Sequence, residues 1–536
     1  MSDPKKLDAI EKREQNPQAL KPFSLSQLKR RLPLTFPLDS NLPPSPKRRY
    51  RSHYRYLGFK DLNSQALKDL SSLETSLRLF DYSNLESLLA AHIYRSSAKG
   101  QAPFHPVSLY LLILFRRENH LSRLEALRRL RNKHEGQELR RLLGFEKAFP
   151  SESGLRYFEK QITPELQREI NALQIDVLYE AGLLPAKPDA AKKVTISFDG
   201  MLHEARSHMR CAHTQAHCYQ PAPRPCPARE KGKQGCDCAT DACLHACQYT
   251  TSRDPDARFI AYSGRNKRNR KSPNAPAQDG QQRLSRGRLV FGYYSGAAQI
   301  LDDDLATYWV LPAAFGPATC GDQTLFPENF TYLRSRFSWL EIDAVLADAG
   351  LGEQSCLDLI WDAGALRMVD IQAHATDADK ENCLARGYNP HGYPFCPFGY
   401  CMKSNGHDYQ RRRTKWRCTK NCRSDPDRPV PDCDYLKPQY KHGYTIYVGR
   451  THADGTVRLA REIPYASPAW YEIYNRRNSA ESRNSLLERL GLKRLPVHGL
   501  QPGHVAVMQG DLISNQHTLI RLIRQAAALG LDPPSA

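Results

Sequence analysis

The stretch Val194-Thr195-Ile196-Ser197-Phe198-Asp199-Gly200 decides the fold class of this chain. Its β-branched and aromatic residues predict a buried strand, and the Asp-Gly pair predicts the end of that strand. Ala344-Val345-Leu346-Ala347 predicts a second short buried strand, which ends in Asp348. Further strands are expected over 288–294 and 308–311, and a helix over 325–337. Strands followed by helices indicate an α/β architecture.

The preceding third of the chain has a helical pattern. Residues 61–185 contain several short amphipathic segments, and Thr163-Pro164 is a good helix start, with a capping hydroxyl and proline at the first helical position. Arginines lie between the apolar positions, so we expect an all-helical DNA-binding domain; a bundle with merely solvated arginines is the alternative. Residues 1–60 are rich in proline and basic residues and are predicted to be a disordered tail.

The overall charge indicates a polyanionic partner. Lysine and arginine number 77 against 57 acidic residues, a formal net charge of +20. The longest nearly unbroken apolar run, 107–115, is far short of the ~20 residues that span a bilayer, so DNA is favoured over a membrane. The charged opening stretch has no signal-peptide pattern, and we expect a cytoplasmic protein.

Three acidic residues form the candidate catalytic set: Asp199 and Asp348, each at a predicted strand end, and Glu481 on a late predicted helix. Magnesium prefers oxygen ligands, and two such ions about 3.5–4 Å apart can clamp both reacting oxygens of a phosphoryl transfer. Asp322 is a rival for the second carboxylate. Asp348 is preferred because it directly follows an apolar strand.

The helix that carries Glu481 has a second signal. Tyr474, Arg477 and Glu481 are spaced by three and then four residues, which places them on one helical face. Arginine can grip a phosphate through two parallel hydrogen bonds, and tyrosine can contact a nucleotide. An exposed charged helix with an ordinary Arg477–Glu481 pair is the alternative interpretation.

These segments together resemble a known family. Residues 474–481 are similar to the Tyr-x2-Arg-x3-Glu-x6-Lys signature of insertion-sequence DDE transposases, and residues 492–499 resemble its continuation. The stretches around Asp199 and Asp348 resemble the strands that carry the two family aspartates. The similarity covers roughly residues 85–530 in the right order. One position departs from the pattern: the family lysine falls on Glu488, so Lys493 or Arg489 would have to replace it.

The resemblance implies a function and an architecture. It implies a ribonuclease-H-like core with Mg²⁺ (or Mn²⁺) on Asp199, Asp348 and Glu481, which binds inverted-repeat DNA ends and catalyses strand cleavage and strand transfer. DNA contacts would involve Tyr474, Arg477 and Lys493, and a homodimer would act on DNA at the bacterial nucleoid. The expected divisions are 190–350 (first part of the core, with a cysteine-rich insertion over 205–285), 380–445 (a second cysteine-rich insertion) and 446–530 (second part, with the glutamate helix).

Fifteen cysteines in a chain without a secretion signal suggest structural zinc rather than disulfides. In the second insertion, the first choice of ligands is Cys396, Cys401, Cys418 and Cys422, with Cys433 as a replacement. In the first insertion, candidates outnumber the four ligands a zinc ion needs. The compact set there is Cys236, Cys238, Cys243 and Cys247.

Two other functions compete. A tyrosine recombinase would use Tyr157 and the His120-x2-Arg123 pair, but it would leave the strand-rich remainder without a role. A zinc-containing DNA-binding protein descended from a transposase, without cleavage activity, would be consistent with Glu488 and the cysteine insertions. Cleavage of a DNA duplex in magnesium distinguishes these functions.

Overall fold

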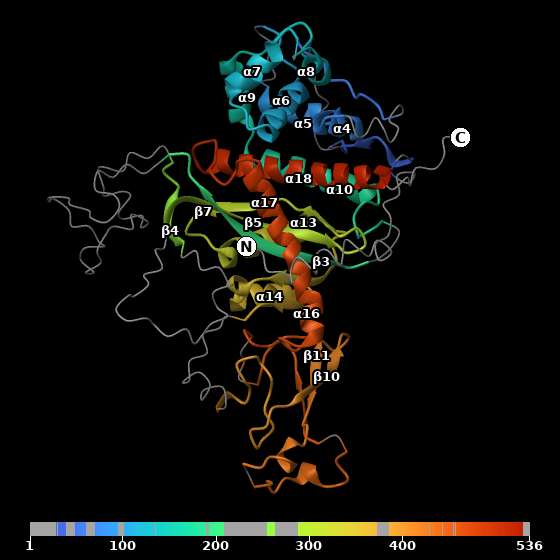
Figure 1. Ribbon diagram of the computed structural model, residues 1–536, viewed down its shortest axis with the longest axis vertical. Coiled ribbons are helices and arrows are strands. Elements are labelled where there is room, and N and C mark those ends of the chain that lie inside the picture. The colour runs from blue at the N-terminus through green and yellow to red at the C-terminus, as the bar shows by residue number, and fades with distance from the viewer. Residues whose placement is uncertain are drawn as a thin grey trace, which may run out of the picture.

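A seven-stranded mixed sheet crosses the middle of the molecule (Figure 1). Its main path is β4–β5–β3–β8–β9, and β6 and β7 both pair with β5. Strand β3 is antiparallel to β5 and parallel to β8, which is parallel to β9. The strands are β3 (Val194–Glu204), β4 (Arg258–Tyr262), β5 (Arg288–Asp302), β6 (Thr307–Val310), β7 (Ala314–Pro317), β8 (Ile342–Ala347) and β9 (Leu366–Val369).

This arrangement comes from a computed structural model. It describes residues 28, 30–38, 49–59, 70–94, 101–134, 136–188, 192–207, 254–262, 288–371, 385–427, 429–441, 443–453, 455 and 457–528. The predicted α/β class is confirmed as a mixed α/β protein. The cysteine cluster with Cys236, Cys238, Cys243 and Cys247 lies outside the described residues. No helix among the described residues is both long enough and apolar enough to cross a membrane.

Strand β3 is longer than predicted. The sequence predicts its end at Asp199-Gly200, but β3 continues to Glu204 because β5 pairs with it from Ile196 onward. Its parallel neighbour β8 ends at Ala347, and the last register pair between the two strands is Ser197–Leu346. Asp199 therefore lies within one strand, at the height where the neighbouring strand has just ended.

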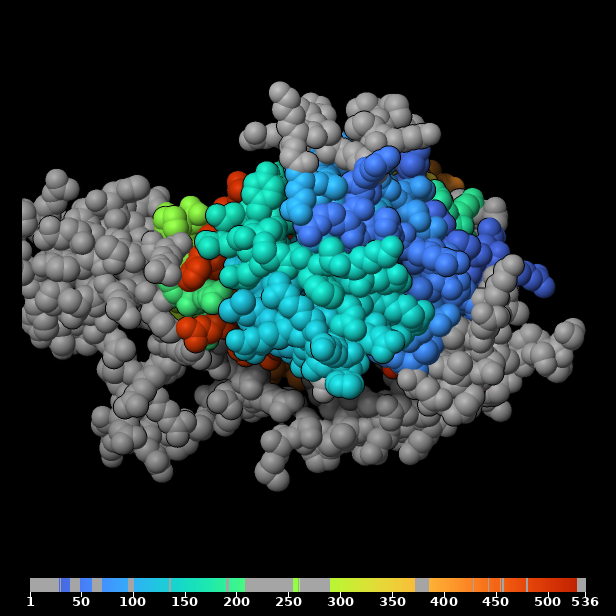
Figure 2. Space-filling view, turned by 90° about the horizontal axis from the view of Figure 1, so that it is seen from above, coloured from blue at the N-terminus to red at the C-terminus, as the bar shows by residue number. Residues whose placement is uncertain are grey.

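The helical region covers one end of the sheet (Figures 1 and 2). Its helices are α4 (Ser72–Leu79), α5 (Leu85–Ile93), α6 (Pro106–Glu118), α7 (Arg123–Arg131), α8 (Gly136–Leu143), α9 (Glu152–Gln161) and α10 (Pro164–Glu180). The Thr163 hydroxyl accepts a hydrogen bond from the Leu166 amide at 3.2 Å, as its capping role predicts. Part of the expected disordered tail packs here instead, since Leu34 and Phe36 are buried and β1 (Leu34–Thr35) pairs with β2 (Phe80–Asp81).

Helices cover both faces of the sheet. Helix α13 (Asp322–Arg336) lies on one face, where Phe326 meets Phe198 of β3 with ring centroids 5.1 Å apart. Helix α18 (Leu500–Ala528) lies on the other, where Met508 packs on Ala297 and Val310. Because side chains alternate along a strand, Asp199 points away from α13 and toward the α18 face. Helix α14 (Gln354–Asp362) lies against β9 and α13.

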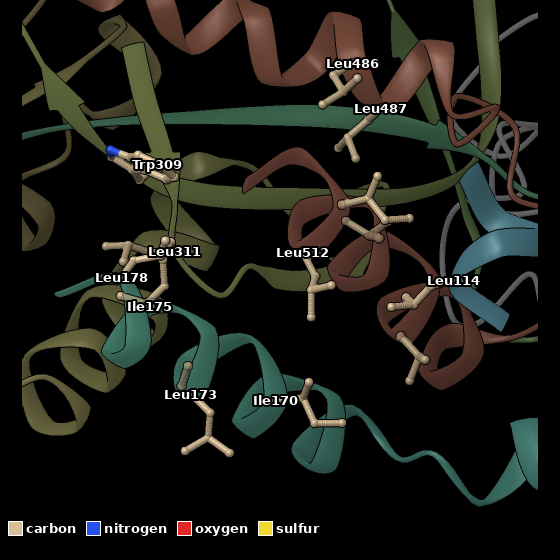
Figure 3. Close-up of a cluster of buried hydrophobic side chains, with 14 of the residues drawn as sticks. Leu114, Ile170, Leu173, Ile175, Leu178, Trp309, Leu311, Leu486, Leu487 and Leu512 are labelled. Carbon is tan, nitrogen blue, oxygen red and sulfur yellow. The ribbon is translucent and has the colours of Figure 1, made fainter. Parts of the chain in front are cut away.

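Helix α10 and helix α18 run side by side beneath helices α4–α9 (Figure 1), joined by buried amide contacts such as Asn171 Nδ2 to the Met508 carbonyl at 2.7 Å. Figure 3 shows the core between them, the sheet and α17 (Ala480–Arg489). Trp309 of β6 and Leu512 of α18 are fully buried in this region. The core therefore joins residues about 300 positions apart in the sequence into one unit.

A small antiparallel sheet forms the far end of the molecule (Figure 1). Its strands are β10 (Lys403–Asp408), β11 (Arg413–Arg417) and β12 (Thr445–Val448), within the predicted 380–445 insertion and just beyond it. A buried ion pair attaches it to the main sheet: Arg367 Nε of β9 lies 2.7 Å from Glu462 Oε1, and the same guanidinium donates to the Arg450 carbonyl. We call residues 385–460 the cysteine subdomain.

Candidate active site at the edge of the sheet

Asp199 and Asp348 lie side by side at the end of the β3–β8 pair. Extending the parallel register from Ser197–Leu346 by two residues sets position 199 opposite position 348, and neighbouring strands are about 4.8 Å apart. Asp348 caps a short 3-10 helix, η3 (Ala349–Leu351), by accepting a hydrogen bond from the Gly350 amide at 2.7 Å. The two predicted strand-end carboxylates are therefore neighbours in space.

Asp322 joins this pair from the first residue of α13. A Cβ on Gly200 would lie 2.4 Å from Asp322 Oδ1, and one on Gly350 would lie 3.6 Å from Asp322 Oδ2 and 2.8 Å from Asp348 Oδ1. The absence of a side chain at both positions thus leaves room for the Asp322 carboxylate beside Gly200 and Asp348. Tyr294 of β5 donates its hydroxyl to Asp322 Oδ1 at 3.1 Å. From the sequence, Asp322 and Asp348 were alternatives for the second carboxylate, whereas in the structure both lie at the site.

The electrostatics of the site reflect crowded negative charge. Burial raises the pKa of Asp199, and the neighbouring Asp348 raises it further, while Arg477 opposes both effects. Burial, then Asp348 and Asp199, raise the pKa of Asp322 to about 7. Such displacement of carboxylate pKa values in a partly exposed cluster is typical of functional sites.

The late helical segment lies across this acidic edge. It consists of α16 (Pro468–Tyr474), a 3-10 stretch η6 (Asn475–Ser479) and α17, rather than the single helix that the sequence predicts. Arg477 Nη2 lies 3.3 Å from Asp199 Oδ1, and both side chains are mostly buried, at 12% and 14% exposed. The signature segment therefore contacts the first aspartate through Arg477, a residue that the sequence analysis assigns to DNA.

Asn484 is a site residue that the sequence analysis did not identify. Its Nδ2 donates to Asp199 Oδ2 at 2.9 Å and to the Gly200 carbonyl at 3.2 Å. Its position seven residues after Arg477 was the available signal, since residues seven apart share a helix face. One segment, which contains Arg477 and Asn484, thus donates hydrogen bonds to both carboxylate oxygens of Asp199.

Glu481 lies between these two contacts along the helix. It is four residues after Arg477 and three before Asn484, so its backbone crosses the acidic edge, but its side chain is exposed to solvent. Within the described ranges, no three His, Cys, Asp or Glu side chains are arranged as metal ligands. Asp348 and Asp199 lie close enough to Asp322 to raise its pKa, but these three carboxylates are not arranged as metal ligands, and the Glu481 side chain is exposed.

The other predicted DNA contacts have different surroundings. Tyr474 stacks on Trp470 with centroids 4.0 Å apart, so one face of its ring is already covered. Lys493 is exposed, and its Nζ lies 2.6 Å from Glu488 Oε1. The lysine that was expected to replace the family lysine is therefore paired with the very residue that occupies the family position.

Compared with known proteins, this chain matches no family model, no curated protein and no solved structure. The geometry of the site is accordingly the basis for any statement about function.

Proposed function

We propose that this chain is a DNA transposase of the DDE type, which cleaves DNA strands and joins the freed ends to a target. The observation that carries the proposal is the juxtaposition of Asp199 and Asp348 at one sheet edge, beneath the helical segment whose Arg477 contacts Asp199. This is the arrangement that the resemblance to insertion-sequence transposases requires of residues 149 positions apart. The net charge of +20 supports a polyanionic substrate.

The donor chemistry of the site fits magnesium. One guanidinium and one amide contact Asp199, and the nearby Asp348 and Asp322 add hard oxygen donors and negative charge at this edge. Asp199 and Asp348 would hold the ion, with Asp322 beside them and Glu481 joining by side-chain rotation. A bound divalent ion lowers the pKa of an attacking water or sugar hydroxyl and neutralises the leaving oxygen.

The protein's own groups orient these carboxylates. Arg477 and Asn484 each bind one oxygen of Asp199, which limits rotation of that carboxylate. The Gly350 amide holds Asp348, and the Tyr294 hydroxyl holds Asp322. Orientation of catalytic groups by surrounding hydrogen bonds is what keeps such a site in a productive geometry.

The test is cleavage of duplex DNA that carries the flanking sequences of this gene, in magnesium and in EDTA. We expect Asp199→Asn, Asp348→Asn and Glu481→Gln to bind the duplex as the wild type does and to leave it uncut. Asp343→Asn is the matched control, because Asp343 is an exposed aspartate on β8 itself and should cut normally. Cutting by the Asp199→Asn variant would overturn the proposal.

A second candidate is a zinc-containing DNA-binding protein without cleavage activity. The exposed Glu481 carboxylate and the Glu488–Lys493 pair favour it, since both depart from an assembled transposase site. Wild-type protein that binds the duplex and leaves it intact in both magnesium and manganese would establish this alternative. Loss of cutting on Tyr157→Phe, with a covalent protein–DNA product in the wild type, would instead indicate a tyrosine recombinase.

A further inference from the structure

The cysteine subdomain places two thiols that are 22 residues apart in the sequence at one small core. Cys396 belongs to this core, Cys418 packs against it, and Cys422 follows Cys418 by four residues. Cys396 and Cys422 are buried, and Cys418 packs on the small core around Trp416 and Val448. A core this small needs reinforcement, because few apolar residues are available to it.

The hairpin geometry separates Cys401 from this group. Phe395 and Cys401 form an antiparallel bridge, so their side chains share one face of the hairpin. Cys396 follows Phe395 by one residue and therefore points to the opposite face, toward the core. The observed burial agrees, since Cys396 is 7% exposed whereas Cys401 is exposed. Cys401 consequently cannot join Cys396 without a shift of the hairpin register.

The turn that follows β11 is shaped around a sulfur. Lys420 adopts a left-handed conformation with φ 58°, and its amide donates to Cys418 Sγ at 3.3 Å. This turn leads directly to Cys422 in a 3-10 helix, η4 (Asn421–Arg423). Amide hydrogen bonds to sulfur stabilise a thiolate and are a common outer contact of metal-bound cysteines.

Cys433 is the fourth cysteine near this group in the fold. It precedes a 3-10 helix, η5 (Asp434–Leu436), and is half-buried. The Arg423 side chain, next to Cys422, donates to the Leu436 carbonyl, and Tyr435 makes an edge-to-face contact with Tyr444, which borders the same core. The segment after Cys433 is therefore held against the turn that carries Cys422.

We propose that Cys396, Cys418, Cys422 and Cys433 bind one structural Zn²⁺, and that Cys401 does not. This revises the ligand set expected from spacing, in which Cys401 came first and Cys433 was the replacement. Zinc takes four thiolates tetrahedrally in closed structural sites. Among the described residues no three of these side chains are arranged as ligands, so the four thiols must move toward one another when the ion binds.

The experiment is zinc quantification on the full-length protein purified with zinc, by mass spectrometry of the metal. Because another cysteine cluster exists in the chain, differences from the wild type are decisive. We expect Cys418→Ser, Cys422→Ser and Cys433→Ser each to contain about one zinc less per chain, and Cys401→Ser to retain the wild-type content. Cys401→Ser is the matched control, since it removes an exposed thiol from the same subdomain.

Cobalt reconstitution guards against a variant that simply fails to fold. The thiolate-to-cobalt absorption of the zinc-stripped chain should drop on Cys433→Ser and stay unchanged on Cys401→Ser. Wild-type zinc content in Cys418→Ser would overturn the site. Loss of zinc in Cys401→Ser together with full retention in Cys433→Ser would overturn the ligand assignment.

A cavity of about 650 Å³ lies on the other side of α17 from Asp199. It supports a second inference that is independent of the zinc site. Ser482, Leu486 and Arg489 of α17 form one wall; they are spaced by four and then three residues and so share a helix face. Helix α18 forms another wall with Arg521 and Arg524. The same helix thus borders the acidic edge on one side and this cavity on the other.

The cavity has positive charge without a counter-ion. Among the residues that the structure describes, its lining contains no Asp or Glu, and none of the three arginines is in an ion pair. Arg521 donates to the Thr307 hydroxyl at 2.6 Å and Arg524 to the Leu70 carbonyl at 2.9 Å, so neutral acceptors position both guanidinium groups. Arg524 Nε is buried and has no hydrogen-bond partner.

We infer that this cavity binds phosphodiester groups of the DNA backbone next to the strand being cut, an inference that rests on the proposed function. Guanidinium groups with nearby hydroxyls, here Ser482 and Ser514, match the acceptors of a phosphate. Each phosphate neutralised by the protein makes the log–log salt slope of binding more negative by about 0.9.

The test is DNA binding in EDTA across a salt series, followed by fluorescence anisotropy of a labelled duplex. We expect Arg489→Gln combined with Arg521→Gln to weaken binding roughly ten-fold and to make the slope less negative by about one or more. Arg334→Gln is the control, because Arg334 is an exposed arginine on α13, on the opposite face of the sheet.

The possible outcomes separate this inference from the proposed function. If the wild type does not bind DNA, both the proposed function and the phosphate-binding role of the cavity are excluded. If the double variant keeps the wild-type salt slope and cleaves normally, only the phosphate-binding role of the cavity is excluded. Pyrophosphate that binds the wild type but not the double variant, with DNA binding unchanged, would assign the cavity to a small phosphate compound and likewise overturn it.

Discussion

Helix α17 contacts two acidic regions that are built in opposite ways. Toward α18, Arg483 meets Asp511 with two hydrogen bonds of 2.7 and 3.0 Å, and both side chains are fully buried. Toward the sheet edge, Asn484 of α17 and Arg477 of the preceding η6 contact Asp199, at 2.9 and 3.3 Å. The carboxylates of Asp348 and Asp322 are nearby. The first region is balanced in charge, although Arg483 Nη1 is buried without a hydrogen-bond partner, whereas the second region has more negative than positive charge.

This difference in charge balance indicates different roles for the two regions. A paired carboxylate needs no further partner, so Asp511 serves to fix α17 against α18. Unpaired, crowded carboxylates are costly to the fold and persist where a cation is to be bound. The same short helix is therefore anchored by one aspartate and aligned over the others, which makes the comparison open to direct experiment.

The largest effect is expected from breaking the balanced pair. Arg483→Met leaves the Asp511 carboxylate buried without a partner, which should cost about 3–5 kcal/mol of unfolding free energy. Urea denaturation measures it. The double variant Arg483→Met with Asp511→Leu should recover most of the loss, because no charge is then buried. A single variant within about 1 kcal/mol of the wild type would show that the pair is not what anchors α17.

A pH experiment at a residue farther along β3 extends this comparison. His203 is fully buried, with Nδ1 2.7 Å from the Leu492 carbonyl and Nε2 2.8 Å from Ser295 Oγ, and burial lowers its pKa to about 4. The folded pKa lies below the unfolded value of 6.5, so its stabilisation is complete above pH 6.5 and is lost as pH falls toward 4.

The expected loss from His203 over that range is roughly 3 kcal/mol, from the 1.36 kcal/mol per pKa unit. Urea midpoints at pH 7 and pH 4.5 measure it, with His203→Gln as the variant that removes the titrating group. Asp322 acts with the opposite sign, since its raised pKa makes the folded state gain stability as pH falls through about 7. A pH slope that is unchanged in His203→Gln would contradict the assignment.

A smaller effect is expected from loosening Asp199. Asn484→Ala removes the hydrogen bond to Asp199 Oδ2 and should lower the cleavage rate roughly 10–100-fold, as for other residues that orient metal ligands. It should also raise the magnesium concentration needed for half-maximal cutting, which a purely structural role would not do. Ser485→Ala is the control, since Ser485 is the next, exposed residue of the same helix. Equal rates in both variants would exclude Asn484 from positioning Asp199.

The smallest effect is expected where charge is balanced at the surface. Lys493 and Glu488 are 59% and 48% exposed, so Glu488→Gln should change the unfolding free energy by less than about 1 kcal/mol. The change frees the Lys493 ammonium and should tighten DNA binding a few-fold at low salt. Asp343→Asn, which also removes one exposed negative charge, measures the effect of net charge alone. An equal gain in both variants would show that Lys493 has no specific role.

Much of the fold was predictable because its signals are local. A capping residue indicated the start of α10, apolar periodicity indicated α13 within a few residues, and the β-branched runs indicated β3 and β8. Long-range pairing decided the lengths of the strands. Strand β3 continues past Asp199 because of β5, a partner about 90 residues away, and no local signal at Gly200 reveals it.

The candidate site was predictable in part. Asp199 and Asp348 were found because strand ends that carry an acid are visible in the sequence, and Arg477 was found by its helical spacing. Asp322 was weighed only as a rival, since nothing local indicates that Gly200 and Gly350 leave room for a third carboxylate. The break of the late helix at 475–479 could not be anticipated either, because it depends on how Tyr474 packs on Trp470 while Arg477 reaches Asp199.

The sequence by itself determined the α/β class, the order of the elements, the excess positive charge and the identity of two of the clustered acids. These follow from properties that each residue carries with it: size, branching and charge. Only the tertiary structure decided which groups meet, namely that Asn484 holds Asp199, that Cys401 faces away from Cys396, and that Arg483 is matched to Asp511 while the edge carboxylates are not. Such pairings depend on strand register and helix rotation, which are set by contacts between residues far apart in the chain.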